Sequence, residues 1–102
     1  MLPKKKKFEV PEVTAKTISP VSLKIYKSKL NKLANSQACI WNVNILLEKQ
    51  KEACEIIKAN SKTNQQGRIF LSAIFYVLAD YPNDVKVNFY NEFQKYKDAI
   101  PT

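Results

Sequence analysis

The sequence contains no histidine and only one glycine, Gly67. Histidine is the commonest general acid–base residue, so its absence removes the most frequent catalytic arrangements. The glycine-rich phosphate loops and the serine and zinc motifs of hydrolases are absent as well. We therefore expect a protein that is not an enzyme and that uses no cofactor. The scarcity of glycine also disfavours an all-β fold, because tight turns use glycine at positive φ.

Cysteine is nearly as scarce, with only Cys39 and Cys54. Without histidine, these two thiols cannot complete a zinc site of cysteine and histidine ligands. We expect both to be reduced and to serve as small core residues. The carboxylates of Glu48, Glu52 and Glu55 fall on one predicted helix. Carboxylates spaced along one helix are ordinarily solvated and do not share a metal ion, so we expect no metal site.

Long apolar stretches are also missing, and no window reaches the ~18 apolar residues of a membrane span. The opening MLPKKKK has the positive charge of a signal peptide, but no apolar segment follows it. We expect a soluble, intracellular protein that does not bind a membrane. The nucleus, a viral factory and a virion are the compartments to consider.

What the sequence does contain is helical periodicity in a chain of 102 residues, which fits one domain. Helices are predicted over residues 20–34, 43–59, 64–79 and 84–99, and Ser19–Pro20 is a helix-start signal. The third helix is apolar almost all round beyond Gly67, which predicts a central, buried position. We expect Ile40 and Trp41 to cover one end of the core. The predicted fold is all-α, a compact four-helix bundle over residues 18–100.

Residues 1–17 are predicted to form an extended, basic N-terminal arm, interrupted by Pro3 and Pro11. Repulsion within its lysine run favours mobility in the absence of a partner. Phe8, Val10 and Val13 offer an alternative, in which the arm docks on the domain as a strand-like segment.

The net charge of +8 is concentrated in the first third of the chain. Residues 1–33 hold nine lysines against two glutamates, a net charge of +7, whereas the other residues hold eight basic and seven acidic side chains. Lysine binds phosphate as a point charge and reads bases less well than arginine does. This distribution favours nucleic acid as the partner, contacted through its phosphates. The alternative is a lysine bias inherited from an AT-rich genome.

Three segments supply candidate nucleic-acid-binding residues: the arm, the first helix, and the polar cluster at the start of the third helix, where free backbone N–H groups favour phosphate. The alternatives are a solvated helix face for the first-helix lysines and ordinary helix capping for the polar cluster. The candidates are Lys4, Lys5, Lys6, Lys7, Lys24, Lys27, Lys62, Thr63, Gln65 and Arg68.

Two segments resemble the SAM-like core-binding domain of tyrosine recombinases, the phage-type integrases. Residues 18–34 match its first-helix pattern at Ser19, Ser22, Tyr26, Leu30 and Leu33. Residues 61–78 match its third-helix pattern at Ser61, Asn64 and the run Leu71, Ser72, Ala73, Ile74. The resemblance implies a SAM-like bundle that clamps duplex DNA with the residues named above. The family's catalytic domain is missing, which implies either a fragment or a stand-alone relative that binds without cutting, from a virus or mobile element.

A second hypothesis is a protein–protein interaction module, such as a virion or assembly component, or a homo-oligomer. This hypothesis requires that some of the aromatic side chains form an exposed patch. The residues expected to contribute are Tyr76, Tyr81, Tyr90, Phe93 and Tyr96.

Overall fold

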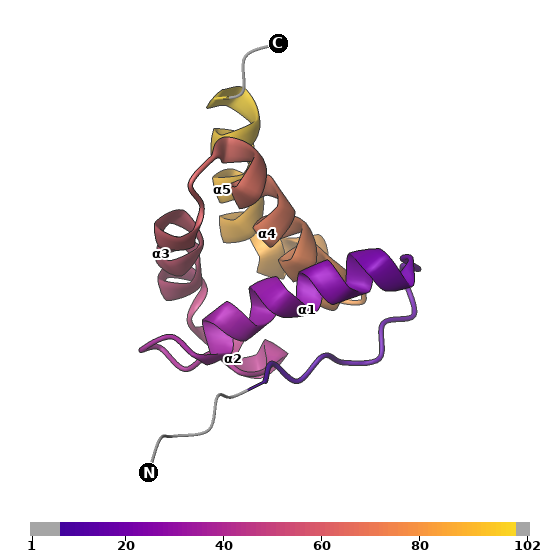
Figure 1. Ribbon diagram of the computed structural model, residues 1–102. Helices are drawn as coiled ribbons and strands as arrows, with labels where there is room; N and C mark the ends of the chain where they lie inside the picture. The colour runs from indigo at the N-terminus through magenta and orange to yellow at the C-terminus, as the bar shows by residue number, and fades with distance from the viewer. Residues whose placement is uncertain (1–6, 100–102) are drawn as a thin grey trace.

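The computed structural model describes residues 7–99, which contain helices and connecting loops but no β-strand (Figure 1). The all-α prediction is therefore confirmed for the described part of the chain. The elements are α1 (Pro20–Ala34), α2 (Val43–Glu48), α3 (Gln50–Asn60), α4 (Asn64–Val77), the 3-10 helix η1 (Asn83–Lys86) and α5 (Val87–Ala99).

Local capping sets the beginnings of α1 and α4. The Ser19 hydroxyl accepts a hydrogen bond from the Ser22 amide at 3.2 Å, and Pro20 occupies the first turn, where a missing N–H costs nothing. The Thr63 hydroxyl likewise accepts from the Gln66 amide at 3.2 Å. Both helix starts predicted from the sequence are thus confirmed.

The predicted helix over 43–59 is divided at Lys49 into α2 and α3, so residues 7–99 contain five α-helices where four were predicted. Lys49 has φ −116° and ψ 45°, outside the helical region. The Gln50 side-chain amide donates to the Leu47 carbonyl at 3.2 Å and to the Val85 carbonyl at 2.9 Å. The Gln50 amide oxygen accepts from Asn88 at 2.9 Å. These bonds satisfy a carbonyl freed by the break and tie the break to η1 and α5.

The segment before α5 also departs from the prediction of a single helix over 84–99. Asn83–Lys86 forms a 3-10 helix, and its N-cap residue is Pro82. The Val85 amide donates to the Pro82 carbonyl at 3.3 Å, an i to i−3 bond of the 3-10 type. The α-helix then begins at Val87.

Helix α4 is the centre of the core, as predicted, and packs against α1, α3 and α5. Its side chains Phe70, Leu71 and Ile74 are fully buried. Ile40 is buried as expected, whereas Trp41 is 38% exposed and does not belong to the core cluster.

Cys39 and Cys54 form no disulfide and are both half-buried; Cys54 packs against the core, whereas Cys39 does not belong to it. Burial, with a smaller contribution from Glu92, raises the pKa of the Cys54 thiol to about 11. Cys39 lies in the loop before α2 with φ 52°, in the left-handed region.

Candidate nucleic-acid interface

The described part of the arm, residues 7–17, lies beside α1 and runs in the opposite direction (Figure 1). Phe8 is only 6% exposed and belongs to the core. Its amide donates to the Asn31 side-chain oxygen at 2.8 Å, and the Glu9 amide donates to the Trp41 carbonyl at 2.8 Å. Of the two arrangements considered for residues 7–17, the structure has the docked one.

A second attachment holds the arm near its other end, at the Asp80 carboxylate after α4. The amide of Thr14 donates to it at 2.9 Å, the Thr14 hydroxyl at 3.0 Å and the Ala15 amide at 2.7 Å. These bonds, led by the one from the Thr14 amide, hold the pKa of the Asp80 carboxyl below its ordinary value. The arm is therefore fixed on both sides of the segment that faces α1.

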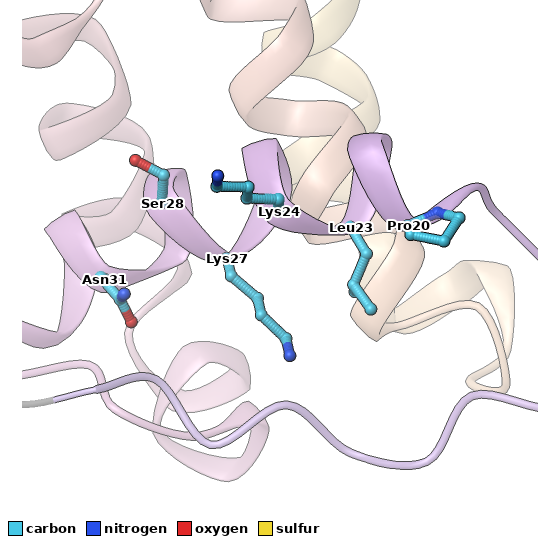
Figure 2. A pocket seen from close by; sticks show the side chains of 6 residues that line it. All are labelled: Pro20, Leu23, Lys24, Lys27, Ser28 and Asn31. Carbon is cyan, nitrogen blue, oxygen red and sulfur yellow. The ribbon is translucent and has the colours of Figure 1, made fainter.

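Two adjoining open cavities lie along α1 and the arm. The first, of about 400 Å³, is lined by Pro20, Leu23, Lys24, Lys27, Ser28 and Asn31 (Figure 2). In Figure 2, Lys27 and Leu23 extend from α1 toward the arm, whereas Lys24 lies along the outer surface of the helix. The second cavity, of about 380 Å³, is lined by Lys7, Phe8, Val10, Lys27 and Asn31. Because the two cavities share Lys27 and Asn31, they form one surface, which we call the lysine groove.

The lysine groove has no negative charge in its lining. The sequence has no acidic residue between Glu12 and Glu48, so α1 carries lysines alone as charged side chains. Lys7, Lys24 and Lys27 are exposed, and none forms an ion pair within residues 7–99. Their charges therefore add, which makes the groove a place for an anion.

Lys29, on the same helix, is half-buried, and this burial lowers the pKa of its ammonium, with a smaller contribution from the nearby Lys32 charge.

The second group of predicted residues lies at the start of α4. Thr63 caps the helix, and the Gln66 side chain accepts from the Lys62 amide at 2.8 Å, so capping accounts for Thr63. Lys62 and Gln65 are exposed, and the Arg68 guanidinium lies 5.7 Å from the centre of the Phe93 ring.

The start of α4 and the lysine groove are separate places on the molecule. Helix α1 crosses the C-terminal half of α4, where the rings of Tyr26 and Tyr76 are 6.0 Å apart (Figure 1). Tyr76 follows Thr63 by thirteen residues, or roughly 20 Å of helix. The structure thus gathers Lys7, Lys24 and Lys27 but leaves the α4 cluster apart from them. Lys4, Lys5 and Lys6 lie outside the described residues.

The predicted aromatic patch is mostly covered. Of its five rings only Tyr90 is exposed, at 45%, and the other four are half-buried. The predicted patch did not include Phe75, which stacks on Tyr90, or Val87, which is 51% exposed. Asn31 shares a helix face with Lys27, four residues before it, but was not among the predicted binding residues.

Comparison with models of protein families, with curated proteins and with solved structures finds no match to this chain. Among residues 7–99, no three His, Cys, Asp or Glu side chains come close enough together to hold a metal ion. None of the helices in that part of the chain combines the length and the apolar character needed to cross a membrane.

Proposed function

We propose that this protein binds duplex DNA, without catalysis, through contacts between its lysine groove and the phosphate backbone. The observation that carries the proposal is that Lys27 lines one cavity with Lys7 and an adjoining one with Lys24, and that neither lining contains a carboxylate. Lysines that neutralise phosphates release condensed counterions, which is the main source of sequence-independent affinity for DNA. The ammonium groups would follow the backbone and read little of the base sequence.

The docked arm supports this proposal because it adds a second wall to the groove. Lys7 stands on the arm and Lys27 on α1, yet both line the same cavity. The attachments of Phe8 and of Thr14 keep that wall in place before DNA arrives. Less side-chain and backbone entropy is then lost on binding.

The likeness of α1 and α4 to the core-binding domain of tyrosine recombinases agrees with this function. The SAM-like arrangement of the bundle, the recombinase relationship and the viral or mobile-element origin stay predictions. Under the proposal, the duplex contacts the start of α4 only if the duplex extends beyond the groove. The residues that it would then meet are Lys62, Gln65 and Arg68.

The experiment compares two double variants that remove the same charge. Lys24→Ala with Lys27→Ala removes two ammonium groups from the groove, and Lys51→Ala with Lys58→Ala removes two exposed ones from α3. Affinity for a labelled duplex is measured by fluorescence anisotropy over a range of salt concentrations. The slope of log K against log salt is negative, and each lost phosphate contact should reduce its magnitude by about 0.9. The magnitude for the groove variant should therefore be smaller by about 1.8.

The α3 variant should keep nearly the full slope, because its lysines lie outside the groove. Circular dichroism would show that both variants keep their helices. The proposal is wrong if the natural chain forms no duplex complex at low salt, or if the two variants lose the same slope.

A further inference from the structure

A second surface with nucleic-acid chemistry lies where α4 and α5 pack side by side. The two helices are antiparallel, because Arg68 meets Phe93 whereas Phe75, two turns later, meets both Phe93 and Tyr90. The ring centres of Phe75 and Phe93 are 5.5 Å apart in an edge-to-face arrangement, and those of Phe75 and Tyr90 are 4.6 Å apart. One cation and three rings thus form a continuous row, which we call the aromatic row.

The exposed end of the aromatic row is the Tyr90 ring. It stacks on Phe75 with an angle of 24° between the ring planes, so Phe75 covers one of its faces. Tyr90 as a residue is nevertheless 45% exposed, so part of its ring away from Phe75 is open to solvent. A planar group can stack on that part while Phe75 holds the ring from behind.

The other end of the aromatic row is positively charged. The Arg68 guanidinium carbon lies 5.7 Å from the centre of the Phe93 ring, and its N–H groups form no hydrogen bond within residues 7–99, so they can bind an anion. Lys97 follows Phe93 by four residues and is exposed, so it lies on the same face of α5. A strand of nucleic acid can stack a base on the open ring at one end of such a row and place a phosphate further along on the cations at the other end.

We propose that the aromatic row binds single-stranded nucleic acid, with one base stacked on the open face of Tyr90 and phosphates further along the strand held by Arg68 and Lys97. A protein partner fits this surface less well. A stable protein interface covers about 800 Å² on each side, whereas only Tyr90 and Val87 are exposed as large apolar side chains here. A single base needs no more than the one ring.

This inference does not depend on the lysine groove, since the two surfaces use different helices. Its test measures affinity for a labelled oligothymidylate and for a blunt duplex, using Tyr90→Ala, Tyr90→Phe and Val87→Ala. Val87→Ala is the matched control, because Val87 is 51% exposed on the same helix, close to the 45% of Tyr90, but has no ring. Tyr90→Ala should weaken oligothymidylate binding about tenfold or more. The oligothymidylate affinity of Tyr90→Phe should stay within about twofold of that of the natural chain, because the stacking ring is kept. The affinity of Val87→Ala should do the same, because no ring is removed.

The groove variant Lys24→Ala with Lys27→Ala separates this proposal from the proposed function. It should reduce duplex affinity while the tenfold effect of Tyr90→Ala on the oligothymidylate remains. The inference is overturned if the oligothymidylate does not bind, if Tyr90→Phe loses as much as Tyr90→Ala, or if Val87→Ala does the same. It is also overturned if light scattering shows an oligomer of the natural chain that Tyr90→Ala dissociates, because the surface would then join two copies.

Discussion

Replacing Gly67 with alanine should destabilise the protein, although alanine is the better helix former. Gly67 is buried within α4, against the Tyr96 ring of α5. An added Cβ would lie 2.5 Å from Cε1, 2.6 Å from Cδ1 and 2.8 Å from Cζ of that ring. Alanine gains about 1 kcal/mol in a helix interior, and overpacking of this kind costs about 1–3 kcal/mol. The free energy of unfolding should therefore fall by about 1 kcal/mol.

Urea unfolding followed by circular dichroism measures this difference from the shift in midpoint at constant slope. The same substitution in a Tyr96→Leu background supplies the control. With the ring removed, Gly67→Ala should raise the free energy of unfolding by about 1 kcal/mol, because only helix propensity remains. A Gly67→Ala variant that is more stable than the natural chain, or an equal effect in both backgrounds, would refute the reasoning.

Three further predictions concern the arm and a thiol. Phe8→Ala should lower the free energy of unfolding in urea by up to about 3 kcal/mol, since the lost side chain is a core residue; no change would show that the arm does not contribute to the core. The lowered pKa of Asp80 gives a stabilising contribution that is present above its ordinary value of 3.8 and lost as the pH falls through the folded-state value. The Thr14 and Ala15 amide signals in NMR spectra should accordingly stay constant from neutral pH to about pH 4 and shift only below it, whereas an earlier shift would contradict the hydrogen bonds described. Cys54, with its pKa raised to about 11, should react with iodoacetamide at neutral pH about a hundredfold more slowly than an ordinary cysteine. Mass spectrometry of the modified peptide measures this rate, and a rate equal to that of an ordinary cysteine would contradict the prediction.

The parts of the fold that the sequence predicts well are those set by neighbouring residues. Ser19 and Thr63 each accept a bond from an amide three residues later, so the capping pattern can be read directly. The central place of α4 follows from its nearly continuous apolar surface.

The break at Lys49 could not be predicted in that way. It is supported by the Gln50 side chain, whose partners Val85 and Asn88 lie 35 and 38 residues away in the sequence. The apolar pattern of 43–59 is helical throughout. Such a pattern depends only on the spacing of nearby residues, so it cannot show which distant carbonyl a glutamine side chain will bind.

For the candidate site, the sequence by itself determined which residues carry the charge and that α1 has no acidic side chain to neutralise it. Only the tertiary structure decided that Lys7 lines the same groove as Lys27, because this depends on the burial of Phe8 and on Asp80, 66 residues from Thr14. Only the packing of α4 on α5 places Tyr90 over Phe75 and Arg68 over Phe93. Charge is a property of each residue, whereas a groove or a stacked ring requires two segments that only the folded core brings together.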